Sequence, residues 1–258
     1  MNDVALTLKN IDFRYGQSEK VNEALFIFEN LHLYLRKGEF VSIIGPSGSG
    51  KSTIFRLITG LEHSDAGTIL IDGKETGNRL GEVGYMPQED LLMPWRTIIE
   101  NAALPLEIQG MKKVQAYHKV RPLLAEIGLG GYEDYFPKDL SGGMKQRVSF
   151  LRAALTGSHV LLLDEPFSAL DAITRISMQE WLLKQWRMLE KSILFITHDV
   201  NEALFLSDRI YVLTGYPKKP IQEITVPLNR PRQLLDLNKP KMLALKDQLI
   251  GQLRGGSR

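Results

Sequence analysis

Gly45-Pro-Ser-Gly-Ser-Gly-Lys-Ser-Thr53 decides the fold of this chain, because it joins an apolar run to a stretch with helical spacing. The run from Phe40 to Ile44 predicts a buried strand, and Ile54 to Ile58 predicts the helix that follows. In that context the pattern GxxxxGK followed by Ser or Thr indicates a phosphate-binding loop. We expect bound phosphates to contact the motif, which consists of Gly45, Pro46, Ser47, Gly48, Ser49, Gly50, Lys51, Ser52 and Thr53.

The residue types of this loop explain how it would hold a nucleotide. Glycines allow backbone N–H groups to approach oxyanions without a Cβ in the way. Lys51 can reach the β- and γ-phosphates, and Ser52 can supply a hydroxyl ligand to Mg²⁺. The helix N-terminus adds partial positive charge. The loop therefore predicts a nucleotide with bound Mg²⁺.

The overall composition is that of an ordinary globular protein. The chain has 258 residues, 43% of them hydrophobic and 24% charged, with a formal net charge of +2. Such a balance creates no field that selects nucleic acid or an anionic membrane, so the charge does not identify the partners; no nucleic-acid partner is expected. There is no cysteine, which excludes disulfides and suits a reducing compartment. Because no long apolar run is present, we expect a cytoplasmic protein that does not itself cross a membrane.

Two further apolar runs end in side chains that can carry out chemistry. Val160-Leu-Leu-Leu-Asp-Glu165 predicts a parallel strand buried on both faces, and ligands bind at the carboxyl ends of such strands. Asp164 is therefore a candidate Mg²⁺ ligand, and Glu165 is a candidate base for an attacking water. A second buried strand, from Ser192 to Thr197, ends at His198. We expect it beside the first, which would bring His198 to the γ-phosphate.

Three weaker features gain weight only from the phosphate-binding loop. Tyr15 ends an alternating strand and could stack on a purine, although a tyrosine at a strand end is far more often a plain surface or core-edge residue. Gln88 follows a strand from Val83 to Met86 and begins a proline-bounded loop. Ser141-Gly-Gly143 opens a helix, where its free N–H groups could bind an anion or simply be capped.

The order of patterns predicts an α/β chain with a mixed sheet and an inserted helical subdomain. Helical spacing replaces strand patterns from Thr97 to about Leu155, with kinks or breaks expected at Pro105 and Pro122. Arg209 to Leu213 is the last expected strand, and a helix is expected near the end. The predicted units are the core at 1–87, the helical subdomain at 88–156, the second part of the core at 157–214, and a C-terminal extension at 215–258.

Taken together, these motifs resemble the nucleotide-binding subunit of an ABC transporter, over nearly the whole chain. Gly45–Thr53 looks like Walker A, Gln88 like the Q-loop glutamine, and Leu140-Ser-Gly-Gly-Met-Lys-Gln-Arg147 like the ABC signature. Val160–Glu165 looks like Walker B. Ser168-Ala-Leu-Asp171 is similar to the D-loop, His198 to the switch histidine, and Tyr15 to the aromatic residue that stacks on adenine.

The resemblance implies a catalytic ATPase that works as a head-to-tail homodimer. ATP would lie between Lys51 and Ser52 of one subunit and Ser141, Gly142 and Gly143 of the other, with Asp171 at the same interface. Glu165 would be the catalytic carboxylate, and His198 and Gln88 would sense the γ-phosphate. The implied Mg²⁺ ligands are Ser52, Gln88 and Asp164.

Two shorter stretches narrow the resemblance to one group of importers. Leu91-Leu-Met-Pro-Trp95 and Val226-Pro-Leu-Asn-Arg-Pro-Arg232 look like importers of nitrate, taurine, aliphatic sulfonates or thiamine-precursor pyrimidines. This implies a peripheral subunit on the cytoplasmic face of the membrane, with a separate permease and an extracytoplasmic solute-binding protein. Trp95 would pack in its loop or dock the permease. The alternatives are a two-component exporter cassette, a non-transport ABC ATPase and, most remotely, a P-loop kinase.

Overall fold

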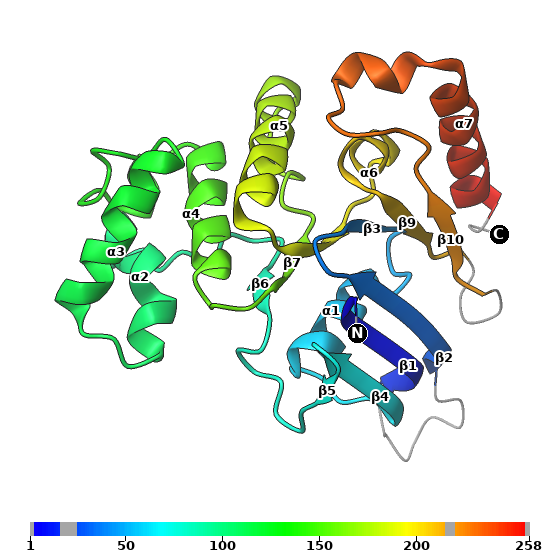
Figure 1. Ribbon diagram of the computed structural model, residues 1–258, viewed down its shortest axis with the longest axis horizontal. Helices are drawn as coiled ribbons and strands as arrows, with labels where there is room; N and C mark the ends of the chain where they lie inside the picture. Colours follow the sequence, from blue (N-terminus) through cyan, green and yellow to red (C-terminus); the bar gives the residue numbers. More distant parts are fainter. Residues whose placement is uncertain (1–2, 16–24, 215–219, 256–258) are drawn as a thin grey trace.

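The computed structural model describes residues 3–15, 25–214 and 220–255, which form two sheets and the helices around them (Figure 1). The strands of the larger sheet, in their order across it, are β10 (Gln222–Thr225), β9 (Arg209–Val212), β3 (Phe40–Ile44), β8 (Ser192–Ile196), β7 (Val160–Asp164) and β6 (Gly84–Met86). Of these strands, β10 alone is antiparallel to its neighbour. The predicted α/β class with a mixed sheet is confirmed.

A smaller antiparallel sheet contains the first strands of the chain. Its strands, in order, are β2 (Leu25–Arg36), β1 (Val4–Tyr15), β4 (Ala66–Ile71) and β5 (Lys74–Glu75). Asp72 and Gly73 form the two-residue turn between β4 and β5, both with positive φ, at 49° and 77°. Asp-Gly favours this turn because both residues tolerate the left-handed region. The polar stretch 16–24 between β1 and β2 lies outside the described residues.

The period of two along the central strands separates two hydrophobic clusters. Val41 and Ile43 of β3 pack with α1 (Lys51–Thr59) and with the smaller sheet, whereas Phe40 packs on the opposite side with α5 (Ala172–Leu189). Every residue of β3, β7 and β8 is buried. The predicted central strands are therefore confirmed, and the carboxyl ends of all three meet at one edge.

Three α-helices and a short 3-10 helix (Pro137–Asp139) lie between β6 and β7 in the chain, and the three α-helices form the left-hand part of the molecule in Figure 1. They are α2 (Ile98–Ile108), α3 (Lys113–Glu126) and α4 (Gly142–Ala154). Their apolar faces share one buried cluster that extends from Leu92 to Leu151. Helix α2 continues through Pro105 and α3 through Pro122, so the chain does not break at either proline, whereas a kink at each remains a prediction. The exact unit boundaries remain predictions, and the one at 214/215 borders residues outside the described part.

Two elements near the end of the chain were not expected from the sequence. The sheet does not end at β9, because β10 pairs with it through residues that are mostly exposed and polar. The short helix α6 (Val200–Leu206) follows β8 directly and is capped by Asp199. The expected terminal helix is present as α7 (Pro240–Gly255), with Met242 and Leu249 buried. In the described part of the chain, no helix has both the length and the apolar character needed to cross a bilayer.

The tail is fastened to the C-terminal end of α6 by a buried arginine. The Arg232 guanidinium donates to the carbonyls of Leu204 at 3.2 Å and Ser207, and to Leu228 at 2.9 Å. Burial lowers the pKa of Arg232 to about 10, so the group stays charged at neutral pH. These bonds satisfy carbonyl groups that a helix end leaves without an internal partner.

Replacing Arg232 with methionine is expected to lower the free energy of unfolding by roughly 1.5–3 kcal/mol, the range for hydrogen bonds to a charged group. Methionine keeps the apolar stem but donates to none of the carbonyls. Urea unfolding would show the loss as a lower midpoint at unchanged slope. Arg254→Met, at an exposed position of α7, is the matched control and should change stability by less than about 0.5 kcal/mol. Equal midpoints for the two variants would contradict this role of Arg232.

Candidate functional site

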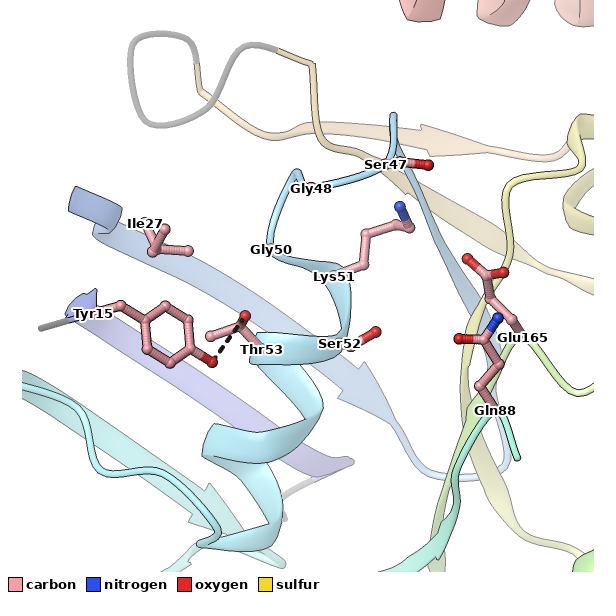
Figure 2. Close-up of a pocket in the computed structure, with 10 residues that line it drawn as sticks. All are labelled: Tyr15, Ile27, Ser47, Gly48, Gly50, Lys51, Ser52, Thr53, Gln88 and Glu165. Carbon is pink, nitrogen blue, oxygen red and sulfur yellow. Dashed lines mark hydrogen bonds between the residues drawn. The ribbon is translucent and has the colours of Figure 1, made fainter. Parts of the chain in front are cut away.

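A cavity of about 380 Å³ opens beside the phosphate-binding loop, at the edge where the central strands end (Figure 2). This volume lies in the range of small-molecule sites. Most of its lining residues were site predictions from the sequence. The lining consists of Tyr15, Ile27, Ser47, Gly48, Gly50, Lys51, Ser52, Thr53, Gln88 and Glu165.

The loop geometry requires its glycines. Gly48 and Gly50 have φ of 77° and 87°, in the left-handed region that favours glycine. A Cβ on Gly45 would lie 2.7 Å from the carbonyl oxygen of Leu213. Among the described residues, the buried Ser49 hydroxyl has no hydrogen-bond partner. An open loop with a free hydroxyl, followed directly by the N-terminus of α1, fits a bound phosphate chain.

Lys51 is held at the mouth of this loop. Its Nζ donates to the carbonyl oxygens of Gly45 and Pro46, both at 2.9 Å. An ammonium has three N–H donors, so these bonds leave a third for a phosphate oxygen. Burial lowers the pKa of Lys51, and the nearby carboxylates of Glu165 and Asp164 partly offset this effect.

Oxygen ligands suited to Mg²⁺ lie together below the loop. The Ser52 hydroxyl donates to Asp164 Oδ1 at 3.2 Å, and Gln88 reaches the same cavity from the loop after β6. Mg²⁺ is typically held by one or two carboxylates together with phosphates and waters, so this donor set fits the ion. Burial raises the pKa of Asp164, although the hydrogen bond from Ser52 opposes the shift.

Glu165 and His198 face each other across the ends of β7 and β8. Nδ1 of His198 lies 3.0 Å from Glu165 Oε2. Since an ionised carboxylate only accepts, Nδ1 must carry the proton in this contact. Glu165 has a φ of 44°, and its N–H donates to the carbonyl of Ile196 at 2.9 Å. Left-handed backbone at a non-glycine residue costs of order 1 kcal/mol or more, and such strain concentrates at functional sites. Figure 2 shows Glu165 and Gln88 on the side of the cavity away from Tyr15.

Tyr15 forms the opposite wall of the cavity. Its ring meets Phe13 edge to face at 4.8 Å, and its hydroxyl lies 3.4 Å from Thr53 Oγ1. Tyr15 is 42% exposed, so part of its surface is accessible to a ligand in the cavity. This placement fits the expected stacking on a purine.

The other predicted nucleotide-binding residues do not line this cavity. Ser141 caps α4 by accepting from the N–H of Met144 at 3.4 Å, and Gly142 and Gly143 form its first turn. Asp171 caps α5, accepting from the N–H groups of Ile173 at 3.1 Å and Thr174 at 3.0 Å. A hydrogen bond from Thr174 lowers the pKa of Asp171. Each has a capping or helix-start role within the chain, and their roles in nucleotide binding remain predictions.

Sequence reasoning did not identify several residues around the site. Tyr85 of β6 lies close to Asp164, and burial together with this carboxylate raises the pKa of Tyr85 to about 12. Arg175 and Glu202 surround the segment that carries His198. They come from different elements, so no linear pattern links them.

Trp95 does not pack in its loop, because it is 73% exposed. The segment that carries it is held by the buried Asn101, whose side chain bonds to the backbone of Met93.

Comparison with known proteins gives the family. A family model described as ABC transporter matches residues 28–168. The formylaminopyrimidine import ATP-binding protein ThiZ of Halalkalibacterium halodurans is 46% identical over 231 residues, covering 89% of this chain and 87% of ThiZ. The nitrate import ATP-binding protein NrtD of Synechocystis sp. is 38% identical over 235 residues and 88% of each chain. The aliphatic sulfonates import ATP-binding protein SsuB of Bacillus cereus is 43% identical over 206 residues, 80% of this chain and 81% of SsuB.

A solved structure agrees with these relatives. The dimeric ATP-binding cassette MJ0796, in a post-hydrolysis state bound to ADP and Pi, matches with a TM-score of 0.73 and 30% identity. The match covers 87% of this chain and 100% of that cassette. The chain therefore belongs to the ABC transporter family, as one of its ATP-binding, ATP-hydrolysing subunits.

Proposed function

We propose that this chain drives the import of a small solute of the sulfonate, taurine, nitrate or pyrimidine type through a separate membrane permease. The observation that carries the proposal is the similarity to ThiZ, SsuB and NrtD, each an import ATP-binding protein, over at least four fifths of both chains. In the working complex the subunit would lie on the cytoplasmic face of the membrane. An extracytoplasmic solute-binding protein would deliver the solute.

The geometry supports a division of labour within the ATP site. The loop amides and Lys51 bind the phosphates, Tyr15 stacks on the adenine, and Ser52, Asp164 and Gln88 hold Mg²⁺. The ion supplies charge neutralisation at the β- and γ-phosphates. Such positioning and electrostatic stabilisation account for most of the catalysis of phosphoryl transfer.

Glu165 acts as the base that orients and deprotonates the attacking water. Its strained backbone, fixed by the hydrogen bond to Ile196, directs the carboxylate into the cavity. His198 orients that carboxylate through Nδ1, which leaves Nε2 for a γ-phosphate oxygen. Gln88 lines the same cavity and links γ-phosphate occupancy to the loop that carries Trp95.

The signature residues act on the ATP of a second copy of the chain. Ser141, Gly142 and Gly143 present a helix N-terminus that does not line the cavity of their own subunit. In a head-to-tail homodimer each such helix start would close the partner's site, with Asp171 beside it. The dimeric state of the cassette MJ0796 supports this arrangement.

A cassette of a two-component exporter would use the same ATP chemistry. The choice of import rests on the relatives, whereas the exposed Trp95 supports docking to a membrane permease of either kind. Tryptophan is enriched among the residues that contribute most to binding at protein interfaces, which fits this docking role of Trp95.

Purification of the tagged protein from its own membranes in mild detergent, followed by mass spectrometry, tests the proposal. We expect a multispanning permease and a solute-binding protein to be recovered, and the ligand of the latter would identify the solute. Trp95→Ala should reduce permease recovery, whereas Val114→Ala, an exposed position on α3, should not. Recovery of ribosomal or DNA-repair proteins without a permease would overturn the transport function.

A further inference from the structure

The backbone on both sides of His198 is held by one hydroxyl group. The Thr197 hydroxyl donates to Glu202 Oε2 at 2.6 Å and accepts from the N–H of Asp199 at 3.0 Å. The His198 side chain itself is 59% exposed, and its ring contacts the carboxylate of Glu165. The direction of the imidazole therefore depends on how its backbone is held.

Glu202 connects this segment to the neighbouring helix α5. Although it is a carboxylate, it is only 5% exposed. Its second oxygen, Oε1, accepts from Gln179 Nε2 of α5 at 3.1 Å. Burial raises the pKa of Glu202, but the hydrogen bonds from Thr197 and Gln179 favour the ionised form. A buried carboxylate is costly, and an aliphatic residue would suffice simply to pack α6 on α5. Its polar contacts therefore call for another explanation.

Arg175 extends the same contacts to the loop before α5. Its Nη2 donates to the carbonyl of Leu170 at 2.9 Å. Its Nη1 lies 3.9 Å from Asp199 Oδ2, and its Nε lies 4.0 Å from Glu202 Oε1. One planar guanidinium thus contacts the loop Ser168–Asp171 and both acidic residues that follow His198.

We propose that Glu202 and Arg175 are positioning residues, which orient His198 toward Glu165 and make that orientation depend on the loop Ser168–Asp171. The inference rests on the proposed function, in which this loop meets the second subunit and His198 senses the γ-phosphate.

The contacts form one continuous path from the loop to the catalytic carboxylate. It runs from the Leu170 carbonyl through Arg175 to Asp199 and Glu202, then through Thr197 to His198 and Glu165. A shift of the loop when two subunits close would displace Arg175, and with it the backbone that carries His198. Assembly of the dimer would thereby complete the hydrolytic site.

Glu202→Gln tests the positioning role, because it keeps the side-chain shape but removes the charge opposite Arg175. In the full-length protein we expect the kcat for ATP to fall about tenfold or more, while KM changes less than about twofold. The matched control is Glu180→Gln, at an exposed position on α5 next to Gln179, which should keep the wild-type kcat.

The decisive measurement repeats Glu202→Gln in a His198→Ala background. If Glu202 acts through His198, the decrease in kcat that Glu202→Gln causes should shrink from about tenfold in the wild-type background to within about twofold in the His198→Ala background. An equal fold-loss in both backgrounds would overturn the inference, because a purely structural defect does not depend on His198. Should Glu202→Gln fail to fold, Arg175→Gln at its partly exposed position replaces it in the same cycle, with the same two outcomes.

Two different results distinguish an error in the proposed function from an error in the positioning role of Glu202 and Arg175. If His198→Ala hydrolyses ATP at the wild-type rate, the role of His198 in the proposed function is wrong, and the positioning role falls with it. If His198→Ala is impaired but folded Glu202→Gln and Arg175→Gln retain the wild-type kcat, the positioning role alone is wrong.

Discussion

Replacing Glu165 with glutamine is expected to slow ATP hydrolysis by roughly a hundred- to ten-thousand-fold, the usual contribution of a positioned general base. Glutamine has the size of glutamate and can keep the contact to His198, but its amide does not take a proton from water. The phosphate-binding loop is untouched, so the Kd for ATP should stay within about threefold. Single-turnover hydrolysis at saturating ATP and Mg²⁺ measures the loss.

The same variant should accumulate as an ATP-bound dimer. If ATP joins the cavity of one subunit to the Ser141–Gly143 helix start of the other, blocked hydrolysis leaves that link in place. Light scattering should then detect dimers in ATP but not in ADP. Glu126→Gln, at an exposed position of α3, is the matched control and should hydrolyse ATP normally. If the Glu165→Gln protein stays monomeric and hydrolyses ATP at the wild-type rate, both the role of Glu165 as the general base and the ATP-linked dimer are wrong.

The nucleotide pocket could be predicted because its determinants are local. A strand, a glycine-rich loop and a helix follow one another from Phe40 to Thr59, and their patterns are readable without tertiary information. The neighbouring carboxylate and histidine could also be predicted, since β7 and β8 are fully buried parallel strands. Side chains that follow adjacent parallel strands must emerge at the same edge.

The positioning residues could not be predicted, because their roles depend on contacts between distant segments. Glu202 occupies an unremarkable position in a seven-residue helix that is too short to show periodicity. Only the packing of α6 on α5 brings it to Gln179 and Arg175. In the same way, β10 could not be predicted, because it is a mostly polar edge strand that is recognised only by its pairing with β9.

Replacing Arg209 with methionine is expected to lower the free energy of unfolding by about 3–5 kcal/mol, the cost of leaving a buried charge unpaired. Arg209 starts β9 and is 3% exposed. Its guanidinium meets Glu39 Oε1 at 2.5 Å and Glu223 Oε1 at 2.8 Å, and it lies 4.1 Å over the Tyr34 ring. Burial by itself would lower the pKa of Arg209, but the hydrogen bonds to Glu39 and Glu223, together with the charges of Tyr211 and Glu39, outweigh it and raise the pKa.

This cluster joins the two sheets, since Tyr34 belongs to β2 and Glu223 to β10. It lies at the start of β9, opposite Val41 at the start of β3, whereas the phosphate-binding loop follows the other end of β3. The folded fraction of Arg209→Met should therefore hydrolyse ATP within about twofold of the wild-type rate.

A second substitution separates the lost ion pair from lost packing. In Arg209→Met with Glu39→Gln no carboxylate remains buried at position 39, while glutamine can still accept from the N–H of Arg36. Urea unfolding should show that the double variant regains about 1–2 kcal/mol relative to Arg209→Met, because removing both partners costs less than removing one. If the free energy of unfolding of Arg209→Met lies within about 1 kcal/mol of that of the wild type, the contacts of Arg209 do not hold the two sheets together. The hydrophobic cluster around α1 alone then performs that role.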